Sequence, residues 1–76
     1  MKANTNIRSL AEGEEGRVLE ITDGQLKNRL TELGFQKGKM VKVIRKSSFS
    51  DSVLVLVSGQ VYGLRKEEAD QILLAS

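Results

Sequence analysis

The stretch NRLTELGFQKGKMVKV, residues Asn28–Val43, changes from a helical pattern to a strand pattern within sixteen residues. The leucines near its start have the i, i+4 and i+7 spacing that places side chains on one face of a helix: Leu26, Leu30 and Leu33. Gly34 follows the last leucine, and glycine readily adopts the positive φ that ends many helices. The sequence therefore predicts a short helix over Gly24–Leu33 that ends at Gly34.

Beyond Gly38 the hydrophobic pattern takes the period of a strand. In Met40–Lys46, Val41 and Val43 alternate with charged residues, as in a strand with one buried face. Val53–Val57 is continuously apolar and rich in β-branched residues, which predicts a strand covered on both faces. The expected strands are short and most are separated by glycine turns: Arg17–Ile21, Met40–Lys46, Val53–Val57, Gln60–Leu64 and Leu73–Ser76.

Two shorter helical segments are expected elsewhere in the chain. Ser9 and Glu12 have the spacing of a capping box and predict one helical turn ended by Gly13. Gly16 then opens the first strand. Arg65–Ile72 predicts a helix of one or two turns, with acidic residues near its start that favour the helix dipole. The whole pattern predicts an all-β fold, a small barrel of about five strands with one or two short inserted helices.

The length of 76 residues allows one domain at most. Residues 1–6 are mostly polar and are predicted to form a flexible N-terminal end, so that the domain covers residues 7–76. No apolar run approaches the roughly 20 residues that span a bilayer, and we expect no direct membrane insertion. The first residues lack the hydrophobic core of a signal peptide, and the expected location is cytoplasmic.

The composition argues against a catalytic or metal-binding site. The chain has neither cysteine nor histidine, which excludes disulfides and thiolate metal sites and removes the usual general base. Glu12, Glu14 and Glu15 could bind a hard cation, but they lack the spacing of an EF-hand, and a solvated loop is the simpler interpretation. The glycine pairs match no phosphate-binding motif. We therefore expect no enzyme activity, no metal site and no cofactor.

Cations are concentrated just after the predicted helix: Lys37, Lys39, Lys42, Arg45 and Lys46. Three interpretations are open, namely a solvated strand face, a surface for an acidic protein or the membrane side, and a nucleic acid site. The stretch lacks the stacking aromatics that single-strand binders interleave with charge, which argues against nucleic acid. The net charge of +2 is too small to decide the matter.

The surface of the helix-to-strand corner is the predicted docking site. Arg29 and Glu32 lie off the leucine face of the helix. Phe35 lies just past the helix end, where an apolar residue serves either as an exposed anchor or as part of the core. The predicted partner-binding residues are Arg29, Glu32, Phe35, Lys37, Lys39 and Lys42. The residues with predicted structural roles are Gly16, Leu26, Leu30, Leu33, Gly34 and Gly38.

Three segments carry a family resemblance: the pattern L-x-x-G-x-x-G-x-V at Leu10–Val18, RLTELGFQKG at Arg29–Gly38, and VYGLRKEEADQI at Val61–Ile72. In this order and spacing they resemble the FeoA family of ferrous iron transport accessory proteins. The resemblance extends from about Ile7 to Leu74. One departure is Lys37, where relatives often carry a proline before the glycine.

The resemblance implies an SH3-like barrel in the cytoplasm, without enzyme activity. It also implies a partner, FeoB, the membrane Fe(II) transporter whose cytoplasmic part carries a GTPase domain. The same domain occurs as the C-terminal module of metal-dependent transcriptional repressors, so binding to such a repressor or to nucleic acid is a second interpretation. The chain lacks a DNA-reading helix, which favours the transporter accessory. The oligomeric state stays open.

Overall fold

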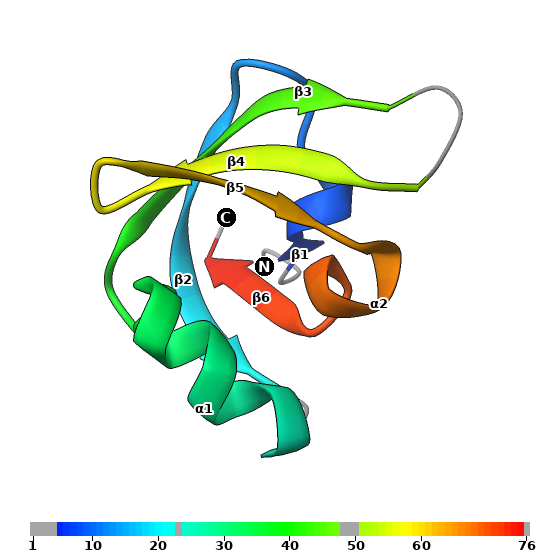
Figure 1. Ribbon diagram of the computed structural model, residues 1–76. Helices are drawn as coiled ribbons and strands as arrows, with labels where there is room; N and C mark the ends of the chain where they lie inside the picture. The colour runs from blue at the N-terminus through cyan, green and yellow to red at the C-terminus, as the bar shows by residue number, and fades with distance from the viewer. Residues whose placement is uncertain (1–4, 23, 48–50, 76) are drawn as a thin grey trace.

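The computed structural model describes residues 5–22, 24–47 and 51–75. The elements in these ranges are, in chain order, β1 (Thr5–Asn6), the 3-10 helix η1 (Ile7–Ser9), β2 (Glu15–Ile21), α1 (Gly24–Leu33), β3 (Met40–Lys46), β4 (Val53–Val57), β5 (Gln60–Leu64), α2 (Lys66–Ala69) and β6 (Ile72–Ala75) (Figure 1). The predicted bounds of α1, β3, β4 and β5 are confirmed. The last helix is shorter than predicted, so that β6 begins at Ile72 rather than Leu73.

One antiparallel sheet contains all of the described strands, in the order β1-β6-β2-β3-β4-β5. Strands β2 to β5 pair with their sequence neighbours, as predicted, whereas β6 returns to pair with β2. The sheet curls strongly, with α1 beside β2 and α2 between β5 and β6 (Figure 1). The predicted fold class, a small mainly-β barrel with short inserted helices, is confirmed.

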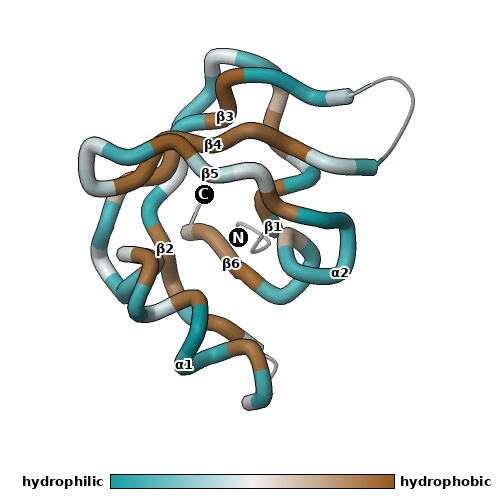
Figure 2. The backbone as a smooth tube through the Cα atoms, in the orientation of Figure 1, coloured by the Kyte–Doolittle hydropathy of each residue, from teal (hydrophilic) through white to brown (hydrophobic). Residues whose placement is uncertain are grey.

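Apolar side chains on the inner face of the curled sheet form the core, and the brown stretches of β2, β4 and β6 follow it (Figure 2). The largest fully buried side chains are Phe35, Ile7, Leu30, Leu64, Ile72, Leu74, Val41, Val43, Val55 and Val57. Leu26 and Leu33 are partly buried and pack against this cluster. The leucine face of α1 therefore covers the core, because its period matches that of a helix.

Helix α1 ends in a Schellman motif centred on Gly34. Gly34 has a φ of 115°, and its N–H donates to the carbonyl of Thr31 at 3.0 Å. The N–H of Phe35 donates to the carbonyl of Leu30 at 3.0 Å. These two bonds satisfy carbonyls that the helix end would otherwise leave free. Leu30 and Phe35 are both fully buried, which supplies the hydrophobic contact that accompanies this motif.

A second turn completes the corner between α1 and β3. The N–H of Lys39 donates to the carbonyl of Gln36 at 3.0 Å, and Gly38 has a φ of 91°. A positive φ at the third position of a four-residue turn is the mark of type II, in which glycine is favoured at that position. Lys37 occupies the second position. The guanidinium of Arg17 donates to the Gly38 carbonyl at 2.9 Å and ties the turn to β2.

Beta-bulges interrupt two of the strands. The register of β2 against β6 shifts between Val18 and Glu20, and that of β3 against β4 shifts between Val43 and Arg45. The extra residues are Leu19 in β2 and Ile44 in β3. A bulge moves every later side chain of its strand to the other face, which explains why the hydrophobic alternation of β2 is imperfect.

The sheet begins earlier than the predicted domain boundary at residue 7. Thr5 pairs with Leu74 and Asn6 pairs with Leu73, both in β6. Residues 1–4 of the predicted flexible end lie outside the described residues.

The predicted helical turn after Ser9 is wrong, since the helical turn lies earlier and Ser9 ends it. Lys46 reaches across from β3, and its ammonium donates to the carbonyls of Arg8 and Leu10 at 2.9 Å each. Its backbone N–H donates to the Glu12 carboxylate at 2.8 Å. In a capping box the Glu12 carboxylate would accept the backbone N–H of Ser9. Here it accepts the N–H of Lys46, a residue far along the chain, so the local capping bond does not form.

Candidate functional site

The predicted docking residues are found around the helix-to-strand corner. Those on the surface are Arg29, Glu32, Lys37, Lys39 and Lys42. Arg29 lines a hollow between α1 and α2, whereas Lys37 lines a groove between α1 and β2. Lys42 lies on the outer face of β3, opposite Glu15. Arg29, Lys37 and Lys42 therefore lie on different parts of the surface around the corner.

Phe35 is not an exposed anchor. Its side chain is 0% exposed, and its ring centroid lies 5.9 Å from that of Tyr62 at an interplanar angle of 52°. The Schellman motif directs the residue after Gly34 back onto the helix, and here that direction is the core. The prediction of Phe35 as a partner-binding residue is wrong, and its alternative placement in the core is confirmed.

Arg29 connects the two α-helices as well as facing solvent. Its Nη1 lies 3.1 Å from the Oε2 of Glu68, and its side chain is 67% exposed. Glu68 is buried, and its Oε1 accepts the backbone N–H of Arg65 at 2.9 Å, which caps the start of α2. The Arg29 side chain is mostly exposed even in this ion pair, so a partner can still contact it.

The groove between α1 and β2 has a volume of about 430 Å³. Its lining includes two cations, Lys27 and Lys37, and one anion, Glu20. Phe35 also lines it. Because charges of both signs face this groove, it has no clear preference for an anionic or a cationic ligand.

The outer face of β4 is exposed, contrary to the prediction that this strand is covered on both faces. The inward residues are buried: Val53, Val55 and Val57. Leu54 is 40% exposed, and Leu56 is only partly buried. The register of the hairpin places Leu56 beside Val61 of β5, which is 55% exposed. A contiguous exposed apolar patch on a small protein marks an interaction surface.

The bulge at Ile44 brings a charge to this outer face. Simple alternation from Val41 and Val43 would direct Arg45 inward. Because the register shifts after Val43, Arg45 lies opposite Leu54 instead. Ile44 and Arg45 are both exposed as a result.

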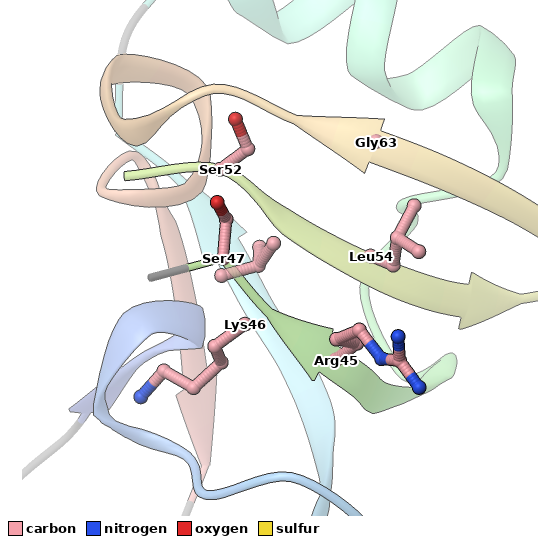
Figure 3. Close-up of a pocket in the computed structure, with 7 residues that line it drawn as sticks. Arg45, Lys46, Ser47, Ser52, Leu54 and Gly63 are labelled. Carbon is pink, nitrogen blue, oxygen red and sulfur yellow. The ribbon is translucent and has the colours of Figure 1, made fainter. Parts of the chain in front are cut away.

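A shallow groove of about 360 Å³ opens on the outer face where β5 has a glycine in place of a side chain (Figure 3). Leu54 and Gly63 contribute its apolar part, and Arg45 lies at its edge (Figure 3). Lys46 points away from Arg45, because its ammonium binds backbone carbonyls near η1. Sequence reasoning missed this groove, and the one signal for it was the glycine within the strand segment QVYGL.

The face around the groove carries charge of one sign. Strands β3, β4 and β5 contain no Asp or Glu, and Asp51 is the single acidic residue between Glu32 and Glu67. Asp51 lies 3.9 Å from the guanidinium of Arg8. The outer face of β3, β4 and β5 is therefore apolar with a cationic edge.

The described residues include no group of three or more His, Cys, Asp or Glu side chains placed to hold a metal ion. Two carboxylates of the N-terminal acidic cluster support the backbone instead. Glu12 accepts from the N–H of Lys46, and Glu14 accepts from the N–H of Ala11 at 2.7 Å. Within the described ranges, the helices are too short and too polar to cross a membrane.

Comparison with known proteins identifies the family. A family model described as the FeoA domain matches residues 5–76. The chain belongs to the FeoA family. This confirms the resemblance found in the three sequence segments, and it links the chain to ferrous iron transport. FeoA proteins are small SH3-like accessory proteins and not a known family of enzymes.

Solved FeoA structures share the fold of this chain. The FeoA protein of Chlorobium tepidum is 25% identical with a TM-score of 0.83, over 92% of this chain and 68% of that one. The FeoA of Stenotrophomonas maltophilia, crystallised with zinc and described as a prokaryotic SH3 domain protein, is 26% identical. Its TM-score is 0.82, over 93% of this chain and 89% of that one.

A manganese-dependent transcriptional repressor also contains this fold. It is 18% identical with a TM-score of 0.87, and the match covers 100% of this chain but 43% of the repressor. At this identity the likeness shows the SH3-like fold alone. Among curated proteins, no sequence matches the chain.

Proposed function

We propose that this FeoA protein is a small, non-enzymatic cytoplasmic accessory of ferrous iron uptake that docks on the cytoplasmic part of an FeoB-type membrane Fe(II) transporter. Membership of the family supports the link to ferrous iron transport. The relative from S. maltophilia has been suggested to act as a ferrous iron transport activating factor. The observation that carries the proposal is the uncovered apolar face of β3, β4 and β5 with its cationic edge.

This face has the composition of an interface. Two exposed large apolar side chains lie on it, Leu54 at 40% and Val61 at 55% exposure, and the partly buried Leu56 lies beside Val61. Interfaces combine such apolar centres with a polar rim, and arginine is enriched in them while acidic residues are depleted. Lys42 and Arg45 of β3 supply the cationic part of the rim here. For a domain this small, binding a partner through this face is the simplest way to act.

The groove residues also support a role without catalysis. Ser47 and Ser52 line the groove of the outer face beside Lys46. A serine nucleophile needs a neighbouring base. The Lys46 ammonium donates to the backbone carbonyls of Arg8 and Leu10 and points away from both serines (Figure 3). The chain has no histidine to replace it.

The exposed charges around the corner serve, in this proposal, to speed association. Charges at the rim of an interface act mainly on the association rate, and salt screens them over about 10 Å at 0.1 M. The residues concerned are Arg29, Glu32, Lys37, Lys39 and Lys42. Their spread around the corner fits a steering role better than a single contact.

The test is binding of the immobilised cytosolic part of the transporter to the wild-type protein and to a variant with Lys37→Glu and Lys39→Glu. We expect the wild type to bind, and the variant to associate more slowly at low salt, with the difference vanishing as salt increases. The variant must melt like the wild type. No binding by the wild type to the cytosolic part, or to the whole transporter in detergent, would refute the proposed function.

A second function is regulation through a metal-dependent repressor or nucleic acid, which the repressor of the same fold favours. Against nucleic acid, Phe35 is buried and Tyr62 packs beside it, so neither of these rings forms an exposed stacking platform. An electrophoretic shift with random DNA, run beside the transporter binding assay, separates the two functions. Binding to DNA without binding to the transporter would support the alternative.

A further inference from the structure

The groove on the outer face of β4 and β5 is kept open by a glycine that the fold does not require. Gly63 does not have the positive φ that other glycines of the chain adopt. A Cβ built on it lies 3.7 Å from Cδ2 of Leu54, which is an ordinary van der Waals contact. A Cβ therefore fits at this position, and most residues with a side chain suit a strand better than glycine does. The absence of a side chain at Gly63 therefore leaves the hollow open.

The guanidinium beside this hollow is not neutralised by the described part of the chain. The Arg45 guanidinium forms no ion pair or hydrogen bond with any described residue. Two other arginines differ in this respect. Arg8 lies 3.2 Å from Asp70, and Arg29 lies 3.1 Å from Glu68. A planar guanidinium at the edge of an apolar groove is suited to a carboxylate, which it binds through two parallel hydrogen bonds.

The charge of the outer face of β3, β4 and β5 also favours a ligand that carries a carboxylate. No acidic residue occurs in β3, β4 or β5, so nothing on these strands repels an incoming carboxylate. Lys42 adds a positive charge, although Glu15 lies opposite it in β2. A second copy of the protein would bring an equally cationic face, and symmetric pairing through this face would place like charges together.

We propose that this groove binds a short acidic segment of the transporter's cytoplasmic part, in which an apolar residue lies next to Asp or Glu. The apolar side chain lies over Gly63 against Leu54, and the carboxylate pairs with Arg45. Leu54 is 40% exposed in the free protein and becomes covered. The inference rests on the proposed function and adds to it the docking groove and the chemistry of the bound segment.

The test compares three single variants for binding to the cytosolic part of the transporter. Gly63→Val fills the hollow, and we expect it to bind at least about tenfold more weakly while melting no lower than the wild type. Arg45→Glu reverses the groove charge and is expected to lose about tenfold or more in affinity at any salt concentration. Lys27→Glu on α1 changes the net charge equally, but Lys27 lines the separate groove between α1 and β2, so this variant should bind nearly as the wild type does.

Amide NMR spectra of the labelled protein locate the contact directly. The signals of Leu54 and Gly63 should shift on addition of the transporter fragment, with smaller changes at Lys27. If the Gly63→Val variant does not fold, Gly63→Ala and these spectra provide the test in its place. Shifts confined to residues away from the groove would overturn the inference.

The outcomes separate this inference from the proposed function. If the wild type binds and the groove variants bind equally well, the groove is not the site, although the accessory role stands. If the wild type does not bind, both the groove inference and the proposed function fail together.

Sedimentation with vesicles of phosphatidylcholine and phosphatidylglycerol tests whether the face binds a lipid surface instead. Vesicle binding that Arg45→Glu abolishes would assign the face to the membrane and overturn the peptide inference.

Discussion

Replacement of Gly34 by alanine tests the corner at the end of α1. Gly34 has a φ of 115°, and a Cβ built on it lies 3.1 Å from Oγ and 3.3 Å from Cβ of Ser58, in the β4–β5 turn. Backbone strain at such a position costs about 1–3 kcal/mol for a residue with a side chain. The crowding adds to this, because the Ser58 Cβ belongs to a tight turn and cannot move alone. We expect a total loss of about 2–4 kcal/mol.

That loss is large for a domain of this size. Folded proteins are stable by about 0.05–0.15 kcal/mol per residue, which corresponds to about 4–11 kcal/mol for this chain. In a domain of this length each kcal/mol lowers the melting temperature by about 4–8 °C. Gly34→Ala should therefore melt at least about 8 °C below the wild type. Urea denaturation followed by far-UV circular dichroism measures the free energy of unfolding directly.

Two other glycines are matched controls. Gly38 has a φ of 91° but no atom within 4 Å of a built Cβ, so Gly38→Ala should show the backbone strain alone. Gly24 has neither a positive φ nor a close neighbour, and Gly24→Ala should be neutral or stabilising by up to about 1 kcal/mol, since alanine favours helices. If Gly34→Ala is no less stable than Gly38→Ala, the crowding against Ser58 contributes nothing. If it is as stable as the wild type, the helix cap is misassigned.

Two further substitutions around the corner have opposite expected effects. Phe35→Ala removes the largest fully buried side chain and should lower the free energy of unfolding by about 3–5 kcal/mol. Thermal melts would show it, and a melting temperature near that of the wild type would contradict the core placement. Lys37→Pro places proline at the second position of the type II turn and should stabilise the domain by about 0.4–1 kcal/mol. Urea titration checks this, and a loss of stability would show that the turn has another geometry.

The bounds of α1 and of the three strands that follow could be predicted because their signals are local. The leucine spacing of α1, the glycine after it and the valine-rich strands each act over a few residues. The family could be recognised partly for the same reason, since Gly13, Gly34 and Gly38 have positive φ at turns. Gly16 is different, because it lies within β2, where a Cβ would come 2.8 Å from the Leu74 side chain. The prediction after Ser9 failed because Lys46, far along the chain, binds the groups that the local motif needed.

The sequence by itself determined the elements of this protein, the face of α1 that is buried and the absence of cysteine and histidine chemistry. Only the tertiary structure decided which side chains face a partner. Phe35 lies in the core because the helix cap at Gly34 directs it back onto α1. Arg45 lies on the outer face of the sheet because the bulge at Ile44 changes the face to which its side chain points. The outer face of β4 is open because neither described α-helix covers it (Figure 1). Burial depends on which elements meet across the sheet, and that is a property of long-range packing rather than of any segment.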